Sequence, residues 1–170
     1  MVRVMENWRD LCDKTLSELG RGPLGEGPPG VCHLRALLTS AFGAPVLVDA
    51  QLPAGVARLC WHVPAPFCAT LRRQRFVPVS RAALSAVSLD AALSLEDQDH
   101  DPVMRDGIVA LGAVVAGERR SRFVVRTLDD PVHRAYFEMM ARLARGGFGA
   151  APPWPVQVTL RSFGIAEVEM

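Results

Sequence analysis

The chain has 170 residues, a formal net charge of +1 and a hydrophobic fraction of 49%. This length fits one ordinary domain, and the apolar fraction is large enough for a core, which argues against global disorder. The near-neutral charge lacks the electrostatic signature of a dedicated nucleic-acid binder, so we expect no DNA or RNA partner. The sequence contains neither an apolar run long enough to span a bilayer nor a recognisable secretory signal, which favours a cytoplasmic location.

The N-terminal residues 1–19 are predicted to hold an amphipathic helix, because apolar residues recur at spacings of three and four. Its apolar face carries four residues that could dock on the domain or bind a partner, namely Trp8, Leu11, Leu16 and Leu19. Residues 20–30 are rich in glycine and proline, which is typical of a linker. Residues 31–170 are then predicted to form a single domain.

The first part of this domain mixes helix and strand signals. Residues 31–42 show a helical apolar stripe followed by Gly43, so we predict a helix there. Residues 45–49 and 56–63 are predicted strands, the second with clear alternation and with prolines after it. Residues 67–79 mix apolar residues with arginines and receive no assignment.

The middle of the chain is ambiguous. Ser80 could cap a short helix that runs to Ala86. Residues 87–95 alternate between apolar and polar positions, which predicts a strand, although an alanine-rich helix is an open alternative. Residues 96–106 form a predicted acidic loop whose carboxylates are expected to be solvated.

Residues 107–147 give the clearest pattern in the chain. Two apolar or alternating strands flank a polar break at Gly117, which predicts a hairpin. Asp130 and Pro131 form a helix start, and a stripe that includes Tyr136, Met139 and Met140 follows. The two glycines at 146–147 are predicted to end this helix. We expect the helix to cover the hairpin, since a hairpin cannot bury its own apolar face.

The C-terminal residues 156–160 alternate and predict a last strand, and residues 164–170 could form another. The sequence WPVQVTLRSFGIAEVEM at this end resembles the opening strands of SpoA-type domains from the cytoplasmic rings of type III secretion and flagellar switches. The resemblance implies a component of a secretion or flagellar ring.

Together these elements predict an α+β domain with an antiparallel β-sheet of about five or six strands packed against two or three amphipathic helices. No serine or cysteine stands in a known catalytic motif, and the cysteines lack the paired spacing of zinc ligands. We therefore assign no catalytic residue and expect no metal and no cofactor. The cysteines are expected to be free thiols.

Arginines form two clusters, and arginine binds carboxylate and phosphate groups bidentately. The clusters consist of Arg72, Arg73, Arg75 and Arg81, and of Arg119, Arg120, Arg122 and Arg126. The main functional hypothesis is a non-catalytic interaction module, such as an adaptor, a chaperone or an assembly subunit, with a protein partner or self-association. The alternative is a binder of a small anionic ligand or nucleotide that uses both clusters.

Overall fold

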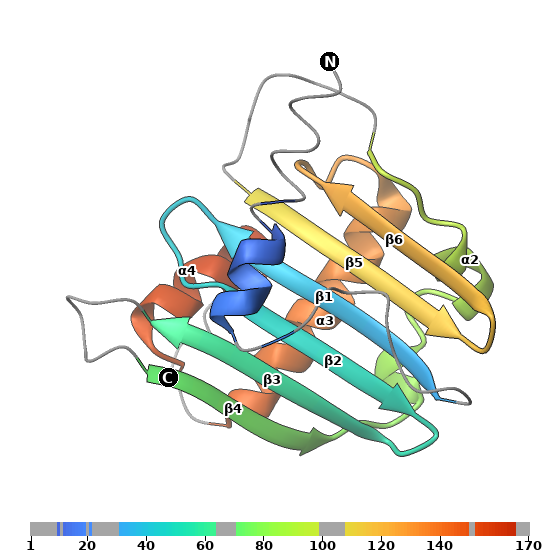
Figure 1. The fold of residues 1–170 in the computed structure, drawn as a ribbon, viewed down its shortest axis with the longest axis horizontal. Helices are drawn as coiled ribbons and strands as arrows, with labels where there is room; N and C mark the ends of the chain where they lie inside the picture. The colour runs from blue at the N-terminus through green and yellow to red at the C-terminus, as the bar shows by residue number, and fades with distance from the viewer. Residues whose placement is uncertain are drawn as a thin grey trace.

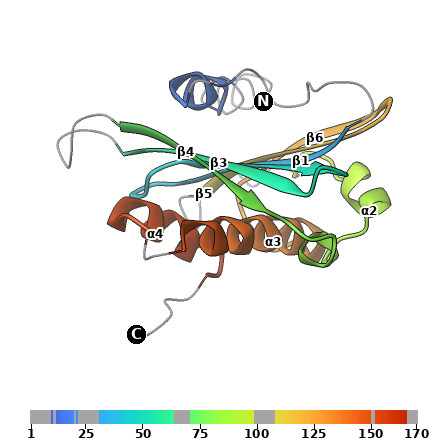
Figure 2. The ribbon, with the colours of Figure 1, turned by 90° about the horizontal axis from the view of Figure 1, so that it is seen from below.

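A computed structural model describes residues 10, 12–19, 21, 31–63, 71–98, 108–149 and 152–165. They form a six-stranded sheet in the order β4-β3-β2-β1-β5-β6, in which every neighbouring pair is antiparallel (Figure 1). Helices α3 and α4 lie under one face of the sheet, and the N-terminal helical segment lies over the other (Figure 2). The predicted α+β class with an antiparallel sheet is therefore confirmed.

The elements have the following bounds along the chain. They are β1 (Cys32–Ser40), β2 (Val46–Leu52), β3 (Val56–Val63), β4 (Leu71–Pro78), the 3-10 helix η1 (Ala82–Leu84), α2 (Leu89–Leu93), β5 (Ile108–Ala116), β6 (Arg119–Val125), α3 (Pro131–Phe148) and α4 (Trp154–Ser162). The strands predicted at 45–49 and 56–63 are thus present as β2 and β3.

The hairpin and helix predicted at 107–147 are confirmed. Strands β5 and β6 are joined at Gly117, whose φ of 62° suits glycine in a tight turn. Asp130 caps α3 by accepting hydrogen bonds from the backbone N–H groups of Val132 (3.1 Å) and His133 (2.9 Å). The bond from His133 is the main reason that the pKa of the Asp130 carboxyl lies below its ordinary value.

The predicted end of this helix is wrong by three residues, because the prediction placed its last residue before the glycines at 146–147. Helix α3 continues through the glycines at 146–147 to Phe148, and Gly149 then ends it with a φ of 66°. Glycine lowers the stability of a helix without forbidding one, and packing of α3 against the sheet offsets the stability that the two glycines cost.

The main core lies between α3 and the sheet. Tyr136, Met139 and Met140 are buried there as predicted. The Tyr136 hydroxyl donates a hydrogen bond to the carbonyl oxygen of Arg35 at 2.8 Å. Burial raises the pKa of the Tyr136 hydroxyl, so it stays a neutral donor inside the core.

The helix predicted at 31–42 is wrong, because this segment is the strand β1. It pairs with β2 on one side and with β5 on the other. Both of its faces are covered: Leu34 and Leu38 belong to the core under α3, whereas Leu37 belongs to a second core on the opposite face. A central strand with two apolar faces loses simple alternation, so its leucines mimicked a helical stripe.

Two predicted strands are helices. Residues 87–95 contain α2, capped by the Ser88 hydroxyl, which accepts from the Ala91 N–H at 3.1 Å; the alanine-rich alternative was therefore right. Residues 156–160 lie in α4, where the Thr159 hydroxyl donates to the carbonyl oxygen of Ala44 at 2.6 Å. The strands that the SpoA resemblance implies are thus absent from residues 152–165, and residues 166–170 lie outside the described ranges.

The second core lies under the N-terminal helical segment, residues 12–18. Leu16 and Leu19 are buried against a sheet surface that includes Leu37, Leu47 and Leu111. Arg122 on β6 forms an ion pair with Asp13 at 2.8 Å, which connects the N-terminal helical segment to β6. The helix predicted at the N-terminus is present over these residues and docks on the domain.

Candidate partner-binding edge and groove

Strand β4 forms one edge of the sheet, and half of its backbone groups face outward. The N–H of Val79 donates to the carbonyl of Gly55 at 2.8 Å, and the β3–β4 register continues this pair inward through Val77. Since backbone direction alternates along a strand, the N–H groups of Gln74 and Phe76 point away from β3. Within the described part of the chain, no hydrogen bond reaches these two amides.

The opposite edge, β6, is covered at its C-terminal end by residues 97 and 98. The Gln98 side-chain oxygen accepts from the backbone N–H groups of Arg126 (2.9 Å) and Thr127 (3.0 Å), and the backbone N–H of Gln98 donates to the carbonyl oxygen of Val124 at 3.0 Å. The Asp97 carboxylate accepts from the N–H of Val124 at 2.9 Å. The two edges therefore differ: residues 97 and 98 cover the C-terminal end of β6, whereas among the described residues no hydrogen bond covers the outward amides of Gln74 and Phe76 on β4.

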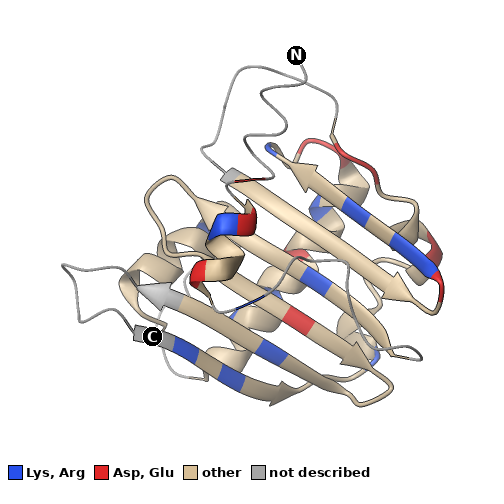
Figure 3. Ribbon diagram, in the orientation of Figure 1, with Lys and Arg blue, Asp and Glu red and all other residues tan. Residues whose placement is uncertain are grey.

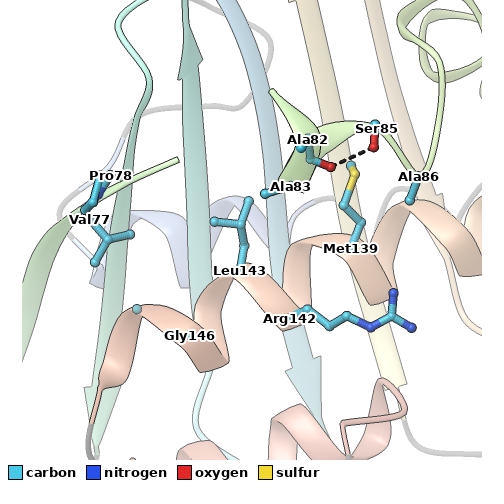
Figure 4. A pocket seen from close by; sticks show the side chains of 11 residues that line it. Val77, Pro78, Ala82, Ala83, Ser85, Ala86, Met139, Arg142, Leu143 and Gly146 are labelled. Atoms are coloured by element: carbon cyan, nitrogen blue, oxygen red, sulfur yellow. Dashed lines mark hydrogen bonds between the residues drawn. The ribbon is translucent and has the colours of Figure 1, made fainter. Parts of the chain in front are cut away.

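An apolar groove of about 640 Å³ lies beside the C-terminal end of β4 (Figure 4). Strand β4 forms one wall, η1 and the residues after it form another, and α3 forms the floor. The lining residues are mostly small or apolar: Val77, Pro78, Ala82, Ala83, Ser85, Ala86, Met139, Arg142, Leu143, Gly146 and Gly147. The arrangement can bind an apolar side chain next to the open strand edge.

The two glycines of α3 have different roles in this groove. A Cβ on Gly147 would collide with Leu59 and would lie 3.2 Å from Val77, so this glycine lets the helix approach the sheet closely. A Cβ on Gly146 would meet nothing within 4 Å. Gly146 therefore leaves space in the groove that folding does not require.

Arg75 ties β4 to the end of α3. Its guanidinium donates to the carbonyl oxygens of Gly147 (3.0 Å) and Phe148 (2.6 Å), where helix carbonyls lack intrahelical partners. We predict that Arg75→Met lowers the free energy of unfolding by about 1 kcal/mol, the typical net value of such hydrogen bonds. Urea denaturation measures this change.

Arg73→Met is the matched control for Arg75→Met. Arg73 is exposed on the same face of β4, and no hydrogen bond from it is found within the described residues. Its substitution should change stability by less than about 0.5 kcal/mol. Equal losses in the two variants would show that Arg75 does not support α3.

The two arginine clusters lie at opposite edges of the sheet (Figure 3). Five strand spacings separate β4 from β6, a distance of about 24 Å. Near β6, Arg119 forms an ion pair with Asp90 at 2.7 Å, and Arg122 pairs with Asp13. A single small ligand therefore cannot contact both clusters.

The other predicted site residues have these places. Arg81 is exposed just after β4, Arg120 is exposed on β6, and Arg126 directly follows β6. Arg72 lies in β4, but its side chain is outside the described set, as are Trp8 and Leu11 altogether. Leu16 and Leu19 are buried within the chain, so they offer no exposed surface in this conformation.

A buried polar cluster lies on the sheet face opposite α3. Asp49 is 2% exposed, and its carboxylate oxygens lie 3.2 Å from His33 Nδ1, 3.2 Å from Arg35 Nε and 3.3 Å from Arg58 Nη2. His33 beside a carboxylate resembles a general-base pair, but two guanidinium groups neutralise the same carboxylate. None of these residues lines the groove, so we assign the cluster to folding.

The described ranges contain no group of three or more histidine, cysteine, aspartate or glutamate residues that could hold a metal ion. Cys12, Cys32 and Cys60 are free thiols. Burial raises the pKa of the Cys12 thiol to about 11, so it is protonated and unreactive near neutral pH.

The chain matches no protein-family model and, at a significant level, no curated protein. Among the helices described, none has the length and apolarity needed to cross a membrane. The geometry of the chain itself defines its class: an antiparallel α+β fold in which β6 is covered at one end and β4 has no such cover among the described residues.

Sequence reasoning missed Gln74, Val77 and Gly146 as parts of a site. One signal was present: Pro78 lies within a strand, and proline in a strand favours an edge position because it cannot donate to a neighbour. The outward direction of the amides and the path of α3 under β4 have no comparable signal in the sequence.

Proposed function

We propose that this protein is a non-catalytic interaction module, such as an adaptor, a chaperone or an assembly subunit, that binds an extended segment of a protein partner at the edge of β4. The partner segment adds a strand to the sheet, and its backbone pairs with the outward groups of Gln74 and Phe76. Such strand addition is a common mode of peptide recognition, in which main-chain hydrogen bonds supply affinity and side-chain pockets supply specificity.

The difference between the two edges carries the proposal. Edge strands promote aggregation unless they are covered or altered, and the chain covers the C-terminal end of β6 with Asp97 and Gln98. An equivalent cover is absent from β4 among the described residues, and Phe76 on this strand is 59% exposed. An edge left open next to an apolar groove supports a binding role.

A partner is favoured over self-association at this edge. If two copies paired antiparallel through β4, the arginines of both strands, including Arg73 and Arg75, would lie close together on neighbouring strands. Like charges on neighbouring strands are destabilising. We therefore expect the isolated protein to be monomeric by light scattering.

Binding of a small anion or nucleotide across both arginine clusters is not proposed further. The clusters lie at opposite edges of the sheet, and the groove contains one arginine, Arg142, among mostly apolar residues. The groove composition suits a peptide side chain better than a phosphate.

Gln74→Pro tests the proposed function directly. Proline removes an N–H that points away from β3, so the pairing of β4 with the sheet should survive. A random dodecapeptide library is selected against the wild-type protein, and the affinity of each selected peptide is measured. We expect Gln74→Pro to weaken binding at least about tenfold, which corresponds to the loss of about 1.4 kcal/mol.

Gln74→Ala is the matched control, because both variants lose the hydrogen bond that Arg21 donates to the Gln74 side chain at 2.9 Å. This control should bind the selected peptides like the wild type. Urea denaturation of both variants establishes that they are folded. Selected peptides that bind Gln74→Pro and the wild type equally would contradict the proposal, as would a library without binders.

A further inference from the structure

We infer that the partner segment is acidic and carries one apolar side chain on the same face as its carboxylates, and that this apolar side chain occupies the groove beside Val77. The inference rests on the proposed function, because it specifies the partner of the same edge. It is carried by separate observations, namely the groove and the charges around it.

The groove lies on the side of the sheet toward which Arg73, Arg75 and Val77 point. These residues alternate along β4 and share a face, and Arg75 on that face reaches the end of α3. A strand added to β4 places its own alternate side chains on this face, next to the same three residues. The side chain next to Val77 lies at the groove formed with Gly146 and Leu143 (Figure 4).

The groove selects an apolar side chain by its lining. Val77, Met139 and Leu143 supply apolar surface, and the small residues at 82, 83 and 146 leave room between the walls. A charged group placed there would lose its hydration without an adequate partner. An apolar side chain instead removes both its own surface and that of the lining from water.

The surrounding charges select an acidic segment. The only charged positions of β4 are basic (Figure 3), and the lining of the groove contains Arg142 and no carboxylate. Arg142 is exposed and is paired with Glu138 at 3.3 Å, so Arg73 and Arg75 provide the main excess of positive charge. Opposite charges across neighbouring strands stabilise a sheet and favour the correct partner.

The spacing of β4 sets the sequence of the partner. Arg73, Arg75 and Val77 follow one another at every second residue. An antiparallel partner therefore carries an apolar residue first and then two acidic residues, each separated by one position. A parallel partner carries the reverse order.

Two synthetic peptides test the inference on the full-length protein. One has the sequence Thr-Leu-Thr-Glu-Thr-Glu-Thr, and the other has the reverse order, so that both strand directions are covered. Each is labelled with fluorescein, and binding is measured by fluorescence anisotropy up to millimolar protein. We expect one of the two orders to bind, and its affinity to fall at least about tenfold when lysines replace its glutamates.

Gly146→Phe fills the groove, and Gly146→Ala is its matched control. Neither Cβ meets another atom within 4 Å, and both residues have a higher helix propensity than glycine, so both variants should fold. We expect Gly146→Ala to bind the peptide like the wild type. Gly146→Phe should weaken binding at least about tenfold, because the leucine of the peptide loses its place.

The outcomes separate the inference from the proposed function. If Gly146→Phe and Gly146→Ala bind the peptide equally, the groove does not hold the apolar side chain. If the glutamate and lysine peptides bind equally, the partner segment need not be acidic. Failure of both peptide orders to bind would also overturn the inference. Each of these results leaves the proposed function standing if library peptides still distinguish Gln74→Pro from Gln74→Ala.

Discussion

Gly112→Ala is expected to lower the free energy of unfolding by about 3 kcal/mol, at the upper end of the cost of overpacking a core. Gly112 lies on β5 directly opposite Phe123 on β6. A Cβ at this position would overlap the Cε2 and Cζ atoms of the Phe123 ring and would lie 3.1 Å from its Cδ2. The ring covers the backbone of β5 at this point, and only glycine leaves room for it.

The Phe123 ring cannot move aside without disturbing other aromatic groups. Its centroid lies 5.2 Å from that of Tyr136, and 5.7 Å from those of Phe137 and His133. All four side chains are buried between β6 and α3. The collision would therefore spread into the packing of α3, which is why we expect a loss near the upper limit.

Adding Phe123→Leu to the Gly112→Ala protein tests whether the Phe123 ring causes the expected loss of stability. A smaller side chain relieves the overlap, so the double variant should lose less stability than the sum of the two single variants, a coupling of about 1 kcal/mol or more. Urea denaturation of all four proteins gives the cycle. Additive losses would show that the ring is not the obstacle.

Gly146→Ala is a useful comparison, because the same type of substitution should raise the stability of the protein there instead of lowering it. Gly146 lies in a helix with open space around it, so alanine should stabilise the protein by about 0.5 to 1 kcal/mol. The sign of a glycine-to-alanine change thus depends on what the new methyl group meets.

Asp49→Ala is expected to cost about 3 kcal/mol, because it leaves positive charge in the sheet without its counterion. The carboxylate is buried, and it faces Arg35, Arg58 and His33 at 3.2 to 3.3 Å. The side chains of Arg35 and Arg58 are 14% and 23% exposed, so water replaces the lost partner poorly. Thermal or urea denaturation measures the loss.

Asp90→Ala is the control that separates burial from distance. Asp90 lies 2.7 Å from Arg119, closer than any partner of Asp49, but its side chain is 83% exposed. An exposed ion pair of this kind contributes about 0 to 1 kcal/mol, so we expect a small change. Similar losses of stability for Asp49→Ala and Asp90→Ala would show that burial does not decide how much an ion pair contributes to stability.

Arg58→Met in the Asp49→Ala protein provides a second test. It removes one of the two guanidinium groups and keeps most of the side-chain volume, so part of the lost stability should return. A double variant less stable than Asp49→Ala would show that Arg58 stabilises the sheet independently of Asp49.

The sequence by itself determined the unit from β5 to α3. Gly117 marks the turn, Asp130 and Pro131 begin the helix, and Tyr136 and Met140 lie on its buried stripe. These signals are local, because each depends on residues within one turn or one helical repeat. The antiparallel α+β class followed from such local patterns.

Only the tertiary structure decided β1 and α4. The pattern of Leu34 to Leu38 predicted a helix. The segment is instead a central strand, because it pairs with a strand on each side and packs against a core on each face. Val156 to Leu160 read as a strand, yet the Thr159 hydroxyl bonds to Ala44 far away in the chain and α4 lies against the sheet. Distant partners overrode weak local preferences in both segments.

The candidate site also depended on the tertiary structure. Gln74, Val77 and Gly146 come from a strand and a helix about seventy residues apart, and the strand order alone makes β4 an edge. The direction of an amide depends on which neighbour a strand already has, and a groove depends on how two elements cross. Neither property belongs to a residue type or to a spacing, so local sequence patterns could not contain them.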